Sequence, residues 1–399
     1  MSDNTNTLPP LLAAKLAEAV YGLVSPESSL KDNIGLLSKN FSLNLIINDS
    51  SLLTATSGLG FIQARTAFGI AAFGVNAYAG HAFIVLRGTD LLGDALTDLH
   101  AGVSHSSKGW YVHDGFNQTF QSLKPDLDAF IEQMNSQSIH SVHCIGHSLG
   151  GALANLVAEY IRTATLYHPY LYTFGAPRVG MGYFANSLTE LLTPQKIFRL
   201  YHRTDIVPCV PCWPFIHAPS KQADMYDYFL PSPGISAGGE WHSMMKYTHS
   251  VTGKGWGDLR SQREELITDS KIEAWLKKET PIQFNLTNLR WLDRAIAYVV
   301  TKCANALGIS LTVGFATGFT LMDKLAYILN KGIDLAKSLT SWVMRLIYKM
   351  MSFIGLKPIA DKSEATQEFV KSVFIQVSEK VNGQVKTTLN QTFYGGQGF

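Results

Sequence analysis

The segment Gly-His-Ser-Leu-Gly-Gly at residues 146–151 places a serine at the spacing Gly-x-Ser-x-Gly. A serine hydroxyl attacks carbonyl carbons when a neighbouring base accepts its proton, so Ser148 is a candidate nucleophile. In this motif the serine sits on a strained turn between a strand and a helix. The apolar run 141–145 predicts the strand, and residues 149–162, with apolar residues three or four positions apart, predict the helix. This context disfavours the alternative, a helix entry that merely contains small residues.

A serine nucleophile needs a histidine base and a carboxylate that orients it, here in the order serine, acid, histidine. The segment 196–208 predicts a strand that ends in a polar turn at Asp205. A carboxylate there would emerge at the C-terminal edge of a parallel sheet. Asp224 and Asp227 are competitors, but both lie in an aromatic-rich run that predicts a strand. We therefore favour Asp205 as the acid.

Two histidines, His242 and His249, lie beyond Asp205, so chain order does not choose between them. Gly238 and Gly239 predict a flexible loop, and a catalytic histidine on this kind of fold lies on a loop after the last strand. His242 is next to these glycines. His249 would lie two helical turns further on, roughly 10 Å along the axis. The spacing favours His242 as the base.

Ester hydrolysis also requires backbone N–H groups that stabilise the oxyanion. Leu149, the first residue after the serine, is one expected donor. The other should come from the loop after an earlier strand, and Thr89, which follows Gly88, occupies that loop. An ordinary Gly-Thr turn is the alternative.

Strands that alternate with helices predict the α/β class with a mostly parallel central sheet. The predicted strands are two segments within 73–89, which flank a turn at 78–81, together with 141–145, 171–175, 196–208 and 223–230. The predicted helices include 9–24, 149–162 and a charged amphipathic helix at 258–279.

Composition excludes several classes of protein. The 399 residues are 46% apolar and 16% charged, which supplies a large core and excludes global disorder. A net charge of +2 without a dense basic run argues against a nucleic-acid partner. Four cysteines are too few for a disulfide scaffold.

The sequence favours a site without metal or cofactor. Cys209 and Cys212, flanked by His202 and His217, form a conceivable zinc site, but two ordinary cysteines in a proline-rich loop are the favoured interpretation. We expect no cofactor.

The first residues lack a basic region followed by an apolar stretch, so they do not resemble a Sec signal peptide. We expect a cytoplasmic protein, or one exported without a Sec signal, with membrane association as an alternative. No pattern points to a particular inhibitor or immunity protein as a partner.

Seven motifs together resemble those of the class 3 lipases, the fungal-lipase-like α/β-hydrolases. They occur in the family's order between residues 11 and 251: VLRGTD, ALTDLHA, VHDGF, GHSLGGALA, YTFGAPRVG, FRLYHRTDIVP and FIHAP. The resemblance implies a Ser–His–Asp esterase acting on acylglycerols or phospholipids, with Thr89 and Leu149 at the oxyanion positions. It also implies structural roles for Asp98, His113 and His217.

The resemblance further implies a lid at residues 90–102, although this segment is less apolar than a strongly interface-activated lid. At the base, the family pattern of histidine followed by tyrosine matches residues 242–249. It assigns His242 as the base and His249 as a second, supporting histidine.

The C-terminal third lies outside the resemblance. Residues 303–322 carry no charge and contain Gly314 and Gly318 at the spacing that allows close helix packing in membranes. A buried helix of a soluble module is the alternative. Residues 332–357 predict an amphipathic helix, with Lys337, Arg345 and Lys349 largely off its apolar face, which could lie on a membrane or pack on a neighbouring helix.

We therefore expect an α/β-hydrolase domain at 1–280, a helical and membrane-associating module at 281–360, and a terminal β-hairpin at 361–399. The hairpin is predicted from an Asn-Gly pair at 382–383 between strand-like runs. The predicted function is lipid ester hydrolysis, as a phospholipase or an acylglycerol lipase, on a lipid substrate at a membrane surface and as an exported effector. The alternative is a membrane-perturbing effector in which the C-terminal helices act.

Overall fold

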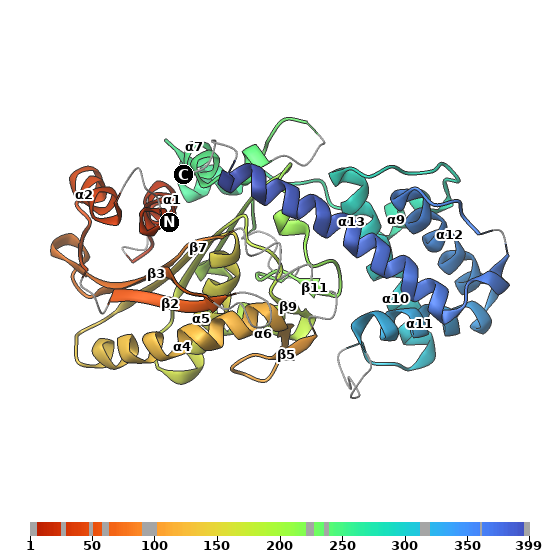
Figure 1. Ribbon diagram of the computed structural model, residues 1–399, viewed down its shortest axis with the longest axis horizontal. Coiled ribbons are helices and arrows are strands. Elements are labelled where there is room, and N and C mark those ends of the chain that lie inside the picture. Colours follow the sequence, from red (N-terminus) through yellow and green to blue (C-terminus); the bar gives the residue numbers. More distant parts are fainter. Residues whose placement is uncertain are drawn as a thin grey trace.

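A mostly parallel sheet forms the centre of the N-terminal part of the chain (Figure 1). The structure, a computed structural model, describes residues 6–24, 29–47, 51–57, 64–89, 102–220, 227–234, 239–311, 320–359 and 361–394. The sheet contains β1 (Asn44–Ile46), β2 (Leu52–Ser57), β3 (Ala64–Val75), β4 (His81–Leu86), β7 (Ser141–His147), β8 (Tyr170–Phe174), β10 (Ile197–His202) and β12 (Asp227–Leu230).

The strand order is β1-β3-β4-β7-β8-β10-β12, with β2 paired to β3 outside this path. From β4 to β12 every neighbouring pair is parallel, whereas β1, β2 and β4 pair with β3 in the antiparallel sense. The predicted α/β class with a mostly parallel sheet is confirmed.

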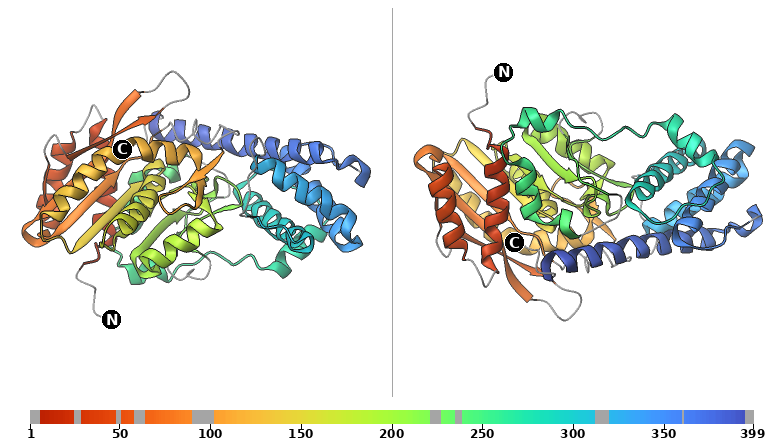
Figure 2. Two further views of the ribbon diagram at one scale, coloured as in Figure 1. Left: turned by 90° about the horizontal axis from the view of Figure 1, so that it is seen from below. Right: turned by 90° about the horizontal axis from the view of Figure 1, so that it is seen from above.

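Helices cover both faces of the sheet, as the two views in Figure 2 show. One face carries α4 (Asp114–Asn135), α5 (Leu149–Ala164) and α6 (Gly182–Leu192), and the other carries α1 (Pro10–Ala19), α2 (Leu30–Phe41), α7 (Met244–Val251) and α8 (Trp256–Arg260). In β4, Ile84 and Leu86 join the first hydrophobic cluster, while Phe83 and Val85 join the second. Burial on both faces explains why this strand is a continuous apolar run.

A second, antiparallel sheet was not predicted. Its order is β11 (Phe215–Ile216), β9 (Gly180–Met181), β6 (Tyr111–His113) and β5 (Val103–His105). Strands of two or three residues are too short to show an alternating pattern. Short 3₁₀ turns are η1 (Val20–Leu23), η3 (Asn76–Tyr78), η4 (Pro194–Lys196), η5 (Val207–Cys209), η7 (Gly239–His242) and η8 (Lys362–Glu364).

The C-terminal third forms a helical module beside the sheet domain (Figure 1). It contains α9 (Asp269–Lys277), α10 (Leu286–Leu307), α11 (Leu321–Leu335), α12 (Lys337–Ile354) and α13 (Gln367–Tyr394). The prediction of one continuous helix at 258–279 is wrong, because residues 261–268 separate α8 from α9. The Thr268 side chain accepts a hydrogen bond from the N–H of Lys271 and so caps the start of α9.

The predicted terminal β-hairpin is wrong. Asn382 and Gly383 lie inside the 28-residue helix α13. Residues buried along this helix recur at helical spacing: Val370, Val373, Phe374, Val377, Val381, Val385 and Leu389. Burial of this continuous apolar face against α11 and α12 outweighs the turn preference of the Asn-Gly pair.

Helix α10 ends at Leu307, because Gly308 adopts a left-handed conformation (φ +66°). Residues 312–319, including Gly314 and Gly318, lie outside the described residues. Among the helices of the described ranges, none is long and apolar enough to cross a membrane.

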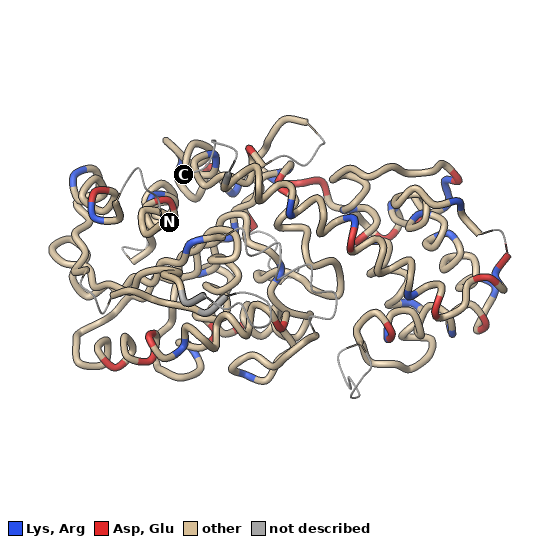
Figure 3. The backbone as a smooth tube through the Cα atoms, viewed as in Figure 1, with Lys and Arg blue, Asp and Glu red and all other residues tan. Residues whose placement is uncertain are grey.

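The apolar face of α12 packs inside the module, since Val343, Leu346, Ile347 and Met350 are fully buried. Lys349, expected largely off this face, is also buried. Its ammonium group donates to the carbonyl oxygens of Lys278 (2.6 Å) and Thr280 (2.8 Å). Basic and acidic residues are interspersed over the module (Figure 3), so its charge pattern is mixed rather than basic.

Candidate active site

Ser148 lies on a sharp turn between β7, which ends at His147, and α5, which begins at Leu149. Its backbone is in an unusual conformation for a residue with a Cβ (φ +56°, ψ −128°). The flanking glycines permit this turn. A Cβ on Gly146 would lie 2.1 Å from the Gly150 oxygen, and one on Gly150 would lie 2.2 Å from the Leu86 oxygen. Such a strained strand–turn–helix is the nucleophile elbow of the α/β-hydrolase fold.

The structure brings Ser148, His242 and Asp205 together, and all three residues are fully buried. The Oγ of Ser148 lies 2.9 Å from Nε2 of His242, and Nδ1 of the same ring lies 2.9 Å from Oδ2 of Asp205. Because a carboxylate only accepts hydrogen bonds, Nδ1 carries the proton and Nε2 accepts the serine hydroxyl. In this tautomer the imidazole can receive the serine proton.

Asp205 follows β10 and is held by two further donors. The N–H of Val207 donates to Oδ1 (2.9 Å), and the hydroxyl of Tyr247 donates to Oδ2 (2.7 Å). Tyr247 is fully buried on α7, and its oxygen also accepts the N–H of His202 (3.1 Å). The sequence contains this tyrosine in the motif after His242, but its contact with the acid was not predicted.

Of the two competing carboxylates, the one that the structure describes, Asp227, is not at this site. Asp227 lies on β12 and pairs with Arg199 at 2.6 Å. Burial raises the pKa of Asp227, and Arg199 opposes this shift. Asp224 lies outside the described residues.

His249, which was expected to support the base, is exposed on α7. Two other histidines instead form hydrogen bonds with the backbone around His242. Nε2 of His147 donates to the carbonyl oxygen of His242 (2.7 Å), and Nδ1 of His202 donates to that of Trp241 (2.8 Å). Burial lowers the pKa of His202 to about 4 and that of His147 well below its usual range. Both rings are therefore neutral near pH 7, and both hold the backbone that carries His242.

His147 also links the nucleophile elbow to the N-terminal helix. Because its Nε2 donates to a carbonyl, its Nδ1 must accept the hydroxyl of Tyr21, at 2.5 Å. The Tyr21 oxygen accepts the N–H of Gly88 (2.9 Å). A chain of three hydrogen bonds thus runs from Gly88 to His242.

Of the predicted oxyanion residues, Leu149 directly follows the serine, and Thr89 follows Gly88, which lies against the serine. As the first residue of α5, Leu149 has no acceptor within the helix for its N–H. Thr89 is buried after β4 and follows Gly88, where a Cβ would lie only 2.7 Å from Cβ of Ser148. The expected lid lies almost wholly at residues 90–101, outside the described residues, and so does Asp98.

The histidines expected to be structural have packing or backbone contacts. Nε2 of His217 donates to the Pro208 oxygen (2.7 Å), and the ring of His113 lies against Phe116 and Phe215. Within the described ranges, no three His, Cys, Asp or Glu side chains gather in a way that could hold a metal ion.

Comparisons with known proteins find similarity to lipases over part of the chain. Residues 83–215 match the family model described as Lipase (class 3). Toxin TseL of Vibrio cholerae serotype O1 is 36% identical over 121 residues, which are 29% of this chain and 18% of that protein. A secreted mono- and diacylglycerol lipase 1 of Fusarium solani is 34% identical over 105 residues, 26% of this chain and 30% of that protein.

A solved structure, the nonglycosylated LIP2 lipase of Yarrowia lipolytica, is 26% identical and covers 56% of this chain and 79% of its own, with a TM-score of 0.41. The fold assignment therefore depends on the topology of this chain. The matches span well under half the length of the two curated relatives. Residues 83–215, about a third of the chain, are thus similar to the class 3 lipases, and the helical C-terminal part lies outside the match.

Proposed function

We propose that this protein is a serine hydrolase that cleaves carboxylic-ester bonds of lipids. The single observation that carries the proposal is the His242 ring, which lies 2.9 Å from both Ser148 Oγ and Asp205 Oδ2. A serine paired with an oriented imidazole can attack an ester carbonyl, and two hydrogen bonds of this length fulfil the geometric requirement.

In the acylation step, Ser148 Oγ forms a bond to the carbonyl carbon while its proton moves to Nε2 of His242. The carbonyl oxygen becomes an oxyanion, which the N–H groups of Thr89 and Leu149 stabilise. When the intermediate collapses, the C–O bond to the alcohol breaks, and the imidazolium returns its proton to the leaving oxygen. Asp205 keeps its charge and stabilises the imidazolium.

In the deacylation step, water replaces the alcohol. His242 accepts a proton from the water as its oxygen attacks the acyl carbon. The second intermediate releases the fatty acid, and the proton returns to Ser148 Oγ. The net reaction is an ester plus water giving an alcohol and a carboxylic acid.

The proposed substrate is a glycerolipid, either an acylglycerol or a phospholipid. The family match supports an acyl ester of a lipid, and the name of the Fusarium relative supports acylglycerols. The similarity to a toxin supports an effector role, with the substrate in a target membrane.

The competing proposal, membrane damage by the C-terminal helices, has less support. Val343, Leu346, Ile347 and Met350 of α12 are buried inside the module, so a membrane could contact them only after the module opens.

The test compares wild type with Ser148→Ala and with Ser136→Ala, an exposed serine after α4. Hydrolysis of emulsified diacylglycerol and of phosphatidylethanolamine vesicles is measured as released fatty acid. We expect Ser148→Ala to lose at least about a thousandfold in kcat with an unchanged Tm, while Ser136→Ala retains wild-type turnover. Turnover that survives Ser148→Ala would refute the assignment.

The same samples separate the two lipid classes and the competing proposal. Lysophospholipid as the main product identifies a phospholipase, and loss of diacylglycerol identifies an acylglycerol lipase. Leakage of dye-loaded vesicles that is equal for wild type and Ser148→Ala would instead favour the C-terminal helices as the active part.

A further inference from the structure

The C-terminal helix α13 connects the helical module to the turn that carries His242. Its 28 residues extend about 42 Å at 1.5 Å per residue. Helices α11 and α12 pack on it within the module, and its other end contacts η7 (Figures 1 and 2). A segment from the end of the chain therefore lies against the proposed active site.

Near the base, α13 forms two hydrogen bonds with the backbone of one residue. The Thr392 hydroxyl lies 2.8 Å from the Gly239 oxygen and 2.9 Å from the Thr388 oxygen of its own helix, so two acceptors share its proton. The Gly239 N–H donates to Oε1 of Gln391 (3.2 Å). Gly239 begins η7, three residues before His242. A Cβ there would lie 2.7 Å from both Cβ of Gln391 and the Thr388 oxygen, so the helix and the turn are in close contact.

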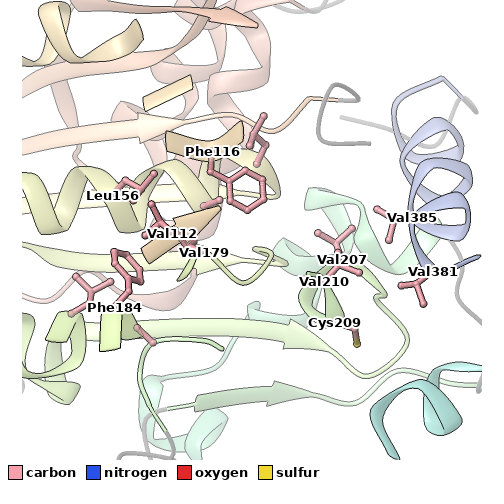
Figure 4. Packing of buried hydrophobic residues seen from close by; sticks show 14 of the residues in the cluster. Val112, Phe116, Leu156, Val179, Phe184, Val207, Cys209, Val210, Val381 and Val385 are labelled. Carbon is pink, nitrogen blue, oxygen red and sulfur yellow. The ribbon is translucent and has the colours of Figure 1, made fainter. Parts of the chain in front are cut away.

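Near the acid, α13 contributes apolar side chains to a shared hydrophobic cluster. Val381 and Val385 are fully buried and belong to the same hydrophobic cluster as Val207 and Val210. Figure 4 shows the two valines of α13 facing the two that follow Asp205. The N–H of Val207 is a donor to Asp205, so α13 contributes to the hydrophobic cluster that contains a residue holding the acid.

We propose that α13 is a positioning element for the acid–base pair, and that Gln391 and Thr392 are positioning residues for His242. The inference rests on the proposed function, because it assigns these residues a role in that reaction. Catalytic groups must be held within a fraction of an ångström, so a turn released at Gly239 displaces the imidazole from Ser148. The helical module and the triad thus form one functional unit.

The test uses variants of the full chain that differ at one hydroxyl. Thr392→Val keeps the shape but removes the donor to Gly239, and Thr392→Ser keeps the donor. Thr387→Val is the matched control, because this exposed hydroxyl bonds only within α13, to the Gly383 oxygen (3.0 Å). Each is assayed for kcat and KM on p-nitrophenyl butyrate, for Tm, and for amide hydrogen exchange of residues 239–242.

We expect Thr392→Val to lower kcat by roughly 10- to 100-fold with KM nearly unchanged, and to speed exchange at 239–242. Thr392→Ser should restore most of the rate, and Thr387→Val should match wild type. Wild-type kcat in Thr392→Val would overturn the inference, whether or not exchange is faster. A kcat loss that Thr392→Ser does not restore would also overturn it.

Failure of the proposed function gives a different result. In that case wild type shows no turnover above Ser148→Ala on any ester, so the reference rate itself is missing. The hydrogen-exchange comparison then still reports whether Thr392 restrains η7.

Discussion

The hydroxyl of Tyr247 and the imidazole of His242 donate to the same oxygen of Asp205, at 2.7 and 2.9 Å. The other oxygen accepts the N–H of Val207. Three donors therefore fix the rotation of the carboxylate and balance its charge in a fully buried place. Gly175 makes room for this arrangement, since a Cβ there would lie 2.7 Å from Oδ2 of Asp205.

Tyr247→Phe should lower kcat on an ester substrate by roughly tenfold with little change in KM. The reason is that a hydrogen bond to a charged group contributes about 1.5–3 kcal/mol and here orients the acid. The control is Tyr172→Phe, which also removes a buried hydroxyl that accepts a backbone N–H, from Leu8 at 3.0 Å, in a hydrogen bond that does not involve the triad. Steady-state kinetics and Tm of both variants are compared. An equal kcat loss in both would show that the effect is general destabilisation.

The two histidines of α7 and its preceding turn should differ sharply in function. His242→Ala should reduce kcat by at least about a thousandfold, because it removes the only base within reach of Ser148 among the described residues. His249→Ala should stay within about twofold of wild type, because its ring is exposed. The measurement is turnover of one soluble ester at pH 8. The reverse result would assign the base to His249.

The strands β4, β7, β8, β10 and β12 could be predicted because each is a short, largely apolar run next to a turn or a helix, whereas β1, β2 and most of β3 were not predicted. The structure brings together Ser148, Asp205 and His242. Each of them lies in a sequence motif that places it at the end of a predicted strand or beside a predicted loop. Their catalytic roles remain a prediction, because proximity alone does not measure turnover.

Other parts depend on contacts between distant segments, which local pattern does not record. Tyr247 meets Asp205 across 42 residues, and Thr392 meets Gly239 across 153. The Asn-Gly pair in α13 is a second example, because its local pattern predicted a turn that the structure does not form. Its turn preference is local, whereas the packing that overrides it comes from distant segments, among them α11, α12 and η7.

Buried histidines should make the protein less stable as the pH falls. Burial, assisted by His140, lowers the pKa of His81 to about 4, and burial lowers that of its partner His143 further below the usual range. In the unfolded chain these groups titrate near 6.5. Below that pH the unfolded state binds more protons, so stability is complete above about pH 6.5 and declines toward pH 4.

Each unit of difference in pKa corresponds to about 1.4 kcal/mol of unfolding free energy. Urea unfolding at intervals from pH 7.5 to 4.5 measures the decline. His81→Gln should make the decline shallower, whereas His249→Gln, at an exposed position, should keep the wild-type slope. A wild-type stability that is constant over this range would contradict the prediction.

The ion pair between Arg178 and Asp293 should hold the helical module on the sheet domain. Arg178 belongs to the segment after β8, and Asp293 lies on α10, with 3.0 Å between Nη1 and Oδ2. Asp293 also accepts the N–H of Trp213 (2.6 Å), so its removal leaves two donors without this acceptor. Because breaking one partner of a buried pair leaves an uncompensated charge, Asp293→Ala should lower the free energy of unfolding by about 3–5 kcal/mol.

The double variant Arg178→Met/Asp293→Leu removes both charges and should be more stable than Asp293→Ala, since an apolar pair of similar volume replaces the ion pair. Urea unfolding of Arg178→Met, of Asp293→Leu and of the double variant gives the coupling energy by a double-mutant cycle. If the single effects simply add, the two side chains do not act as a pair. If they couple by more than about 1 kcal/mol, the contact contributes to docking α10 on the segment that follows β8.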